Sequence, residues 1–213
     1  MKIFVINLDS AKDRWEQYEN DDRYTRWPAT HYDDLPVTHP IFDDMVSYWN
    51  INPKEHKAKA ACYISHTSLW KYIVKNKIND VLILEDDAEL VGKLPDSSKL
   101  PQDGFTYLGG FASHTRLTQG PIKLDFEPGL YQIDYSKFRM LMMLAIYIPH
   151  YSIALKMIQA VEERGRPRAI DTMIKDTKRS QYLLYPAPFI EKNYPSQIRK
   201  NKKKHSNEFY EWV

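Results

Sequence analysis

The chain has 213 residues, 43% of them hydrophobic and 27% charged, values that are typical of a soluble globular protein with one or at most two domains. Its formal net charge of +2 indicates neither a polyanion-binding protein nor an enzyme of acidic substrates. A single cysteine excludes an internal disulfide and a zinc site made of several cysteines, and it favours a reducing compartment. The apolar runs are far shorter than the roughly 20 residues of a membrane span, so we expect a cytoplasmic protein without one.

Strands alternate with helices along the sequence, a pattern that predicts an α/β fold with a mainly parallel central sheet flanked by helices. In chain order, we expect a strand at 2–8, a charged helix at 9–18, an irregular segment at 19–53, a long helix at 54–77, a strand at 81–84, a strand at 105–110, a hairpin or loop at 113–136, a strand at 141–148, helices at 152–163 and 170–178, and a last strand at 181–185. Residues 1–190 are predicted to form one domain, and residues 191–213 a basic tail or linker.

The segment NDVLILEDDAEL places three consecutive carboxylates, Glu85, Asp86 and Asp87, directly after a buried strand. Two carboxylates about 5 Å apart repel by roughly 3 kcal/mol at an effective dielectric constant of about 20. A divalent cation, a raised pKa or exposure to water would relieve this repulsion. Side chains alternate along a strand, so Glu85 and Asp87 point to one side and are the predicted ligands of Mn²⁺ or Mg²⁺. The alternative is that the three acids cap the next element and face water.

The same segment resembles the start of a bacterial receiver domain, in which an acidic pair binds Mg²⁺. That family needs a phosphoacceptor aspartate after a later apolar strand and a Lys-Pro pair after the last strand. Here the phosphoacceptor would have to be Asp125, which has little apolar sequence before it, and Pro186 follows Tyr185. The receiver interpretation therefore fails at two of its three positions.

Three segments taken together resemble glycosyltransferase family 25, the group of lipooligosaccharide and collagen galactosyltransferases. They are FVINLDSAKDRWE with Asn7, Leu8 and Arg14, ACYISHTSLW with Cys62, Ser65, His66 and Trp70, and VLILEDDAEL. Weaker similarities follow in the family's order, including RAIDTMI with Asp171. The resemblance implies the GT-A nucleotide-diphosphosugar fold. The compact length and basic tail resemble capsid-decorating glycosyltransferase domains of large algal DNA viruses, which would place the protein in the host cytoplasm.

The resemblance also implies roles for individual residues. Asn7, Leu8 and Asp9 would hold the nucleotide of a UDP-sugar, and Ser65, His66 and Asp86 would complete the donor site. Arg14, or a lysine of the basic tail, would pair with phosphate. Asp171 is the catalytic candidate, as a base on the acceptor hydroxyl or as a group that orients the donor sugar. His150 and His205 are candidate third metal ligands. The simpler alternatives are that Asn7 and Asp9 cap the first helix, that Asp171 lies in the first turn of a helix, and that Cys62 and Trp70 belong to the core.

The expected activity is metal-dependent transfer of a sugar from a UDP-sugar to a hydroxyl of a glycan or glycoprotein, with no nucleic-acid partner. A nucleotidyltransferase using the same acids is an alternative, although the Gly-rich, Lys-containing phosphate loop of such enzymes is missing after the first strand. A non-enzymatic module that binds a polyanion through residues 200–204 of the basic tail is the second alternative.

Overall fold

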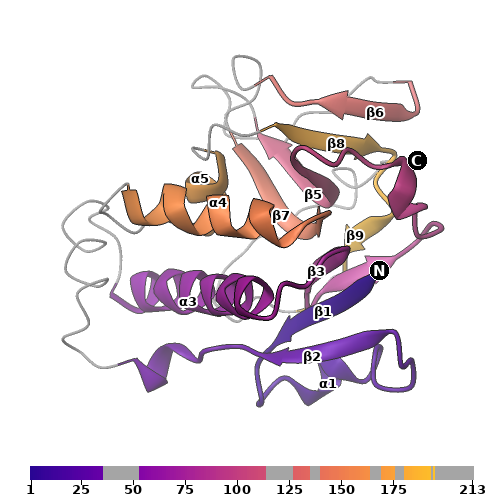
Figure 1. Cartoon of the computed structure of the whole chain (residues 1–213). Helices are drawn as coiled ribbons and strands as arrows, with labels where there is room; N and C mark the ends of the chain where they lie inside the picture. The colour runs from indigo at the N-terminus through magenta and orange to yellow at the C-terminus, as the bar shows by residue number, and fades with distance from the viewer. Residues whose placement is uncertain are drawn as a thin grey trace.

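The computed structural model describes residues 1–35, 53–113, 127–134, 140–163, 169–175, 180–192 and 194. The described residues form a mixed sheet whose main path has the order β2-β1-β3-β7-β5-β8-β6 (Figure 1). The strands on this path are β1 (Lys2–Asn7), β2 (Tyr24–Pro28), β3 (Val81–Glu85), β5 (Phe105–Ser113), β6 (Gly129–Gln132), β7 (Met140–Ile148) and β8 (Gln181–Tyr185). Two short strands, β4 (Ala88–Leu90) and β9 (Phe189–Glu191), pair with each other beside that path.

Five of the strands on the path run in one direction. β2 and β3 are parallel to β1, and β5 and β8 are parallel to each other. β7 lies between β3 and β5 and is antiparallel to both, so β5 and β8 run the same way as β1. β6 is antiparallel to β8. The predicted α/β class with a largely parallel sheet and flanking helices is confirmed, and β7 and β6 are its reversed strands.

Helices cover the sheet unequally. The described α-helices are α1 (Lys12–Trp15), α3 (Pro53–Lys75), α4 (Tyr151–Glu163) and α5 (Ile170–Lys175), and two 3₁₀ turns lie at η1 (Tyr32–Asp34) and η2 (Ser97–Lys99). In Figure 1, α3 and α4 lie side by side, while α1 lies near β2, away from this pair. The two long helices therefore pack together on one side of the sheet, and the other side is covered by short segments.

The alternation of side chains along β1 and β3 builds two cores. Phe4, Ile6, Val81 and Ile83 belong to the hydrophobic cluster that includes residues of α3, α4 and α5. Their neighbours Ile3, Val5, Leu82 and Leu84 belong to a second cluster, which includes Tyr18 and Leu100. Both faces of these strands are buried, which explains why their sequences read as continuous apolar runs.

Three predicted elements differ from the structure. The first helix is only four residues long, and its cap residue is Ala11, without a side-chain cap bond, because the Asp9 side chain pairs with Arg26 instead. Within the segment expected to be irregular, β2 pairs with β1 from Tyr24 to Pro28, and residues 36–52 lie outside the described part. A third difference is β9, which lies at Phe189–Glu191, where no strand was predicted. Much of the predicted hairpin or loop at 113–136 is also outside the described residues.

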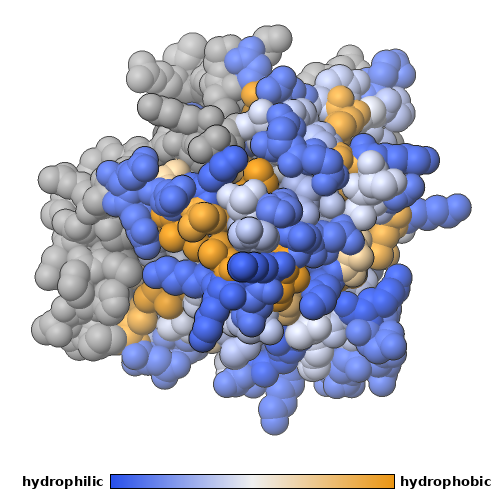
Figure 2. Space-filling view, viewed as in Figure 1, coloured by the Kyte–Doolittle hydropathy of each residue, from blue (hydrophilic) through white to orange (hydrophobic). Residues whose placement is uncertain are grey.

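The surface seen in Figure 2 is mostly hydrophilic, with hydrophobic side chains gathered near the middle of the face. Large apolar side chains that are clearly exposed are few among the described residues: Met1, Tyr72, Val91, Leu130 and Leu155. None of the helices in the described ranges is long and apolar enough to cross a membrane.

A glycine allows the close approach of β5 to β9. A Cβ atom at Gly109 would lie 2.8 Å from the Cβ of Phe189 and 2.9 Å from its carbonyl oxygen. Gly109→Ala should therefore force a backbone shift and lower the free energy of unfolding by about 1–3 kcal/mol, measured by urea unfolding. The control is Gly92→Ala, whose Cβ would meet nothing closer than 3.6 Å and should change stability by less than about 0.5 kcal/mol. Equal unfolding midpoints for the two variants would contradict this account.

Candidate active site

The carboxyl ends of β1, β2 and β3 meet at one edge of the sheet because the three strands are parallel neighbours. Leu8 and Asp9 follow β1, Ala29 follows β2, and Asp86 and Asp87 follow β3. The acids predicted for the metal and the residues predicted for the nucleotide are thus brought to the same edge.

Asp86 is a buried structural carboxylate. Its side chain accepts hydrogen bonds from Arg14 Nη1 at 2.6 Å and from Asn7 Nδ2 at 2.9 Å. Gln17 Nε2 also donates to the Asp86 carbonyl oxygen at 2.9 Å. Asp86 therefore ties β3 to β1 and to the segment around α1. Contacts of Asp86 and Arg14 with a donor substrate stay predictions, and in this structure the two side chains bind each other.

The Asn7 side chain is 1% exposed, and both its amide nitrogen and its amide oxygen form hydrogen bonds. Its two hydrogens serve Asp86 and the Ala11 carbonyl oxygen, the latter at 3.0 Å, and its oxygen accepts from Arg26 Nε at 2.8 Å. Arg26 also contacts Asp9 Oδ1 at 2.6 Å. Asn7 thus positions the β1 end, and the nucleotide contact predicted for it stays a prediction.

Asp87 carries the strongest signal for a cation. Its Oδ1 is buried and has no hydrogen-bond partner in the described ranges, while its Oδ2 lies 3.5 Å from Arg14 Nη1. Burial, followed by the charges of Glu85 and Glu191, raises the pKa of Asp87 to about 8 although Arg14 lowers it. A buried oxygen beside further carboxylates suits a hard divalent cation, which prefers oxygen ligands. Glu85 and Asp87 therefore fit the predicted Mn²⁺ or Mg²⁺.

Glu85 faces α3, on the opposite side of β3 from Asp86. His66 Nε2 lies 3.5 Å from Glu85 Oε1, and the His66 side chain is 2% exposed. Burial lowers the pKa of His66 to about 4, although Asp171 raises it, so the imidazole is neutral at physiological pH. A neutral His66 adds no positive charge beside Glu85, and the charge of Glu85 contributes to the raised pKa of Asp87.

Asp171 reaches the same acidic group from α5. Its Oδ1 accepts a hydrogen bond from the backbone N–H of Met143 in β7 at 2.8 Å. Burial, and next the charge of Glu85, raises the pKa of Asp171 to about 7. The structure therefore brings Asp171 into electrostatic contact with Glu85 and His66, while its catalytic role stays a prediction.

Ser65 braces the site. Its hydroxyl donates to the Ala61 carbonyl oxygen at 2.7 Å and accepts from the backbone N–H of Thr30 at 2.9 Å. The Trp27 indole donates to Ser68 at 3.2 Å in the same region. These bonds fix the chain after β2 to α3. A donor-substrate contact of Ser65 or His66 stays a prediction.

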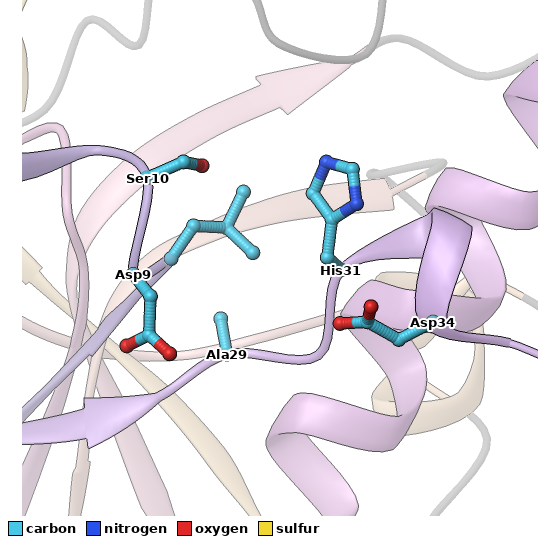
Figure 3. A pocket seen from close by; sticks show the side chains of 6 residues that line it. Asp9, Ser10, Ala29, His31 and Asp34 are labelled. Atoms are coloured by element: carbon cyan, nitrogen blue, oxygen red, sulfur yellow. The ribbon is translucent and has the colours of Figure 1, made fainter.

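A pocket of about 190 Å³ opens at the carboxyl ends of β1 and β2 (Figure 3). Its lining residues come from the ends of β1 and β2 and from the η1 region: Leu8, Asp9, Ser10, Ala29, His31 and Asp34. In Figure 3, Ser10 and Asp9 stand on one side, and His31 and Asp34 on the other. An apolar wall with two carboxylates suits a ligand that has a flat ring and several hydroxyl groups.

His150 is not a metal ligand of this site, contrary to one prediction. Its Nδ1 accepts a hydrogen bond from Ser152 N at 3.2 Å at the start of α4. The neighbouring Pro149 carbonyl oxygen binds Asp80 N, just before β3, whereas Glu85 and Asp87 lie at the other end of that strand. His205 lies outside the described residues. The prediction that Trp70 belongs to the core is confirmed, because its side chain is fully buried.

Sequence reasoning missed several groups that shape the site: Gln17, Arg26, the Glu191 carboxylate and the contact of Cys62 with the acids. Glu191 and Cys62 interact electrostatically with Asp87. Cys62 and His66 are four residues apart on α3, a spacing that places both on one helical face and could have indicated that Cys62 also faces Glu85. Glu191 gave no such signal, because β9 is only three residues long.

A mixed α/β sheet with clustered acids and a pocket at the carboxyl edge is the arrangement of a GT-A-like glycosyltransferase. The sequence pattern of glycosyltransferase family 25 (LPS biosynthesis protein) matches residues 1–117, more than half of the 213 residues. The chain belongs to this family. The match covers the ends of β1, β2 and β3 but stops before Asp171. Comparison with curated proteins gives no match.

The Arg14–Asp86 pair should be essential for stability. Its two side chains are 8% and 11% exposed, so Arg14→Met leaves a buried carboxylate without its main partner. We expect a loss of about 3–5 kcal/mol in urea unfolding. The control Arg23→Met breaks the exposed pair with Asp21 and should change stability little. Adding Asp86→Asn to Arg14→Met should recover part of the loss, and no loss in the single variant would refute the buried-pair account.

The raised pKa of Asp87 predicts a pH dependence in the presence of EDTA. Between about pH 5 and 7 the folded protein keeps a proton on Asp87 that the unfolded chain has released, so stability falls as pH rises, by about 1.4 kcal/mol per pH unit for such a group. Asp87→Asn removes this dependence and should gain stability relative to wild type as pH rises toward 8.

The lowered pKa of His66 has the opposite effect, since the folded protein binds fewer protons than the unfolded chain between about pH 4 and 6.5. His66 is present in both proteins, so it cancels in the difference between wild type and variant. Unfolding midpoints measured across this range for both proteins test the prediction. Parallel stability curves would show that Asp87 titrates normally.

Proposed function

We propose that this protein transfers a sugar from a UDP-sugar to a hydroxyl of a glycan or glycoprotein, with Mn²⁺ or Mg²⁺ held by Glu85 and Asp87. The observation that carries the proposal is the buried Asp87 oxygen without a hydrogen-bond partner in the described ranges, beside a second carboxylate and at the sheet edge that also forms the Leu8–Asp9 pocket. Membership of family 25 supports glycosyl transfer as the type of reaction.

Each group has a proposed task. A divalent cation, when bound, stabilises the negative charge that grows on the diphosphate as the sugar leaves. Leu8 provides an apolar wall for the nucleobase, and the Asp9 and Asp34 carboxylates accept hydrogen bonds from ribose hydroxyls. Arg14 holds Asp86 and partly offsets the rise in the pKa of Asp87 that burial and the neighbouring carboxylates cause.

Asp171 is proposed to handle the acceptor. A pKa of about 7 lies near the value at which a carboxyl group both takes and gives a proton readily at neutral pH. The Met143 N–H fixes the carboxylate, which would accept the proton of the acceptor hydroxyl or orient the donor sugar.

The proposal predicts Mn²⁺-dependent nucleotide binding. Calorimetric titration of UDP should show binding with Mn²⁺ and none with EDTA, and Asp87→Asn should weaken it at least about tenfold, or about 1.4 kcal/mol. Glu163→Gln, at the exposed end of α4, is the control of equal charge change and should bind as wild type does. Binding that is unchanged in EDTA or in Asp87→Asn would reject the metal site.

The same titration separates the alternatives. Preference for a nucleoside triphosphate over UDP and UDP-sugars would support a nucleotidyltransferase. Salt-sensitive binding of a polyanion without any UDP binding would support a module that acts through the basic tail.

Occlusion of the pocket provides an independent prediction. Ser10 is exposed and lines the pocket, so Ser10→Trp should fill it without disturbing the core. We expect UDP binding to weaken at least about tenfold while Mn²⁺ still stabilises the protein against heat. Lys93→Trp places the same side chain at an exposed position outside the pocket lining and should leave UDP binding intact. Normal UDP affinity in Ser10→Trp would move the nucleotide site elsewhere.

A further inference from the structure

Cys62, His66 and Glu85 form a cluster whose chemistry differs from that of the carboxylate pair. Each residue offers one ligand atom, and these atoms all lie within 4.8 Å of one another. Cys62 and His66 are one turn apart on the 23-residue helix α3, and Glu85 ends the central strand β3. A long helix and a buried central strand therefore hold the three groups, which is the support that a preformed metal site requires.

The spacing is close to that of a tetrahedral zinc site. Zn–S and Zn–N distances of about 2.3 and 2.0–2.1 Å put neighbouring ligand atoms about 3.3–3.6 Å apart. His66 Nε2 and Glu85 Oε1 are 3.5 Å apart, which is already one such edge. Bringing the sulfur from within 4.8 Å to this distance requires only a small side-chain movement.

The imidazole provides a second, independent observation. His66 is 2% exposed, and its Nδ1 is buried with no hydrogen-bond partner within the ranges that the structure describes. A neutral imidazole has one nitrogen that donates and one that accepts, so a buried ring with a contact at only one nitrogen is incompletely satisfied. Coordination of a cation by Nε2 would replace its 3.5 Å contact with Glu85 by a metal–nitrogen bond and leave the proton of the neutral ring on Nδ1.

We propose that Cys62, His66 and Glu85 bind Zn²⁺, with a fourth position open to water or a ligand. Thiolate and imidazole ligands select a borderline-soft ion over Mn²⁺ or Mg²⁺, whereas Glu85 with Asp87 offers oxygen ligands alone. Glu85 belongs to both sets. Zn²⁺ in the mixed site therefore engages a carboxylate of the oxygen pair, and Zn²⁺ and Mn²⁺ compete through this residue.

Cobalt spectroscopy tests the site without any sugar nucleotide, so its result is independent of the proposed function. Co²⁺ added to the reduced protein should give visible bands of tetrahedral cobalt and a near-ultraviolet thiolate-to-cobalt band, both removed by equimolar Zn²⁺. Cys62→Ser should lose the thiolate band, and His66→Gln should weaken Zn²⁺ binding at least about tenfold. The matched control Asp87→Asn removes a neighbouring acid that is not in the cluster and should keep the band.

The outcomes separate the two metal sites. A weak octahedral cobalt spectrum without a thiolate band in wild type would overturn the proposal, even if Mn²⁺-dependent UDP binding were intact. Loss of the band in Asp87→Asn would also overturn it, because the ion would then belong to the oxygen pair. Near-ultraviolet circular dichroism verifies folding, and Cys62→Ala serves as a second variant if Cys62→Ser fails to fold.

The competition through Glu85 rests on the proposed function and has its own readout. Zn²⁺ added to wild type with Mn²⁺ should weaken UDP binding, and Cys62→Ala should resist this effect while binding UDP normally without Zn²⁺. Equal inhibition of both proteins would show that Zn²⁺ acts at the oxygen pair instead, whereas absence of UDP binding in all conditions would reject the proposed function and leave the cobalt result standing.

Discussion

The burial of Asp86 between β1, β3 and α1 is the interaction on which the edge of the sheet depends. A carboxylate at 8% exposure is costly unless its oxygens are bound, and here Arg14 and Asn7 bind one each. Because Asn7 also holds Ala11 and Arg26, the same network fixes the turn after β1 and the end of β2. The walls of the pocket are therefore positioned by a buried ion pair whose two residues are not among those that line the pocket.

The alternation of side chains on β3 divides the three acids between two environments. The Asp86 side chain points to the same side of the sheet as Leu82 and Leu84, toward α1, where it pairs with the Arg14 guanidinium. The Glu85 side chain points to the same side of the sheet as Val81 and Ile83, toward α3, where it lies beside the neutral imidazole of His66. The charge of Glu85 raises the pKa of both Asp87 and Asp171, and this repulsion among the three carboxylates is what a cation would relieve.

The parts of this arrangement that follow from local sequence were predictable. The apolar runs of β1 and β3 and the carboxylates that follow β3 gave the strand ends and the separation of Glu85 from Asp86, whereas Asp87 lies beside Arg14 together with Asp86. The elements that sequence reasoning missed depend on contacts between residues far apart in the chain. β2 is a partly exposed edge strand that contains Pro28, so its sequence carries little strand signal until β1 is present as a partner. The shortness of α1 depends on the pairing of Asp9 with Arg26 rather than on a helix cap.

The second half of the chain completes the acidic site, although the family pattern ends at residue 117. Asp171 arrives from α5 and is held by β7, the reversed strand beside β3. Glu191 arrives from β9, which pairs with β4 directly after Asp87, and Lys192 N donates to the Asp87 carbonyl oxygen at 2.6 Å. The backbone on both sides of Asp87 is therefore clamped, by Gln17 at Asp86 and by Lys192 at Asp87. Because the backbone at Asp87 is fixed, its side chain stays buried beside the other carboxylates instead of rotating into water. The raised pKa of Asp87 is therefore a consequence of the whole fold rather than of the three-acid sequence alone.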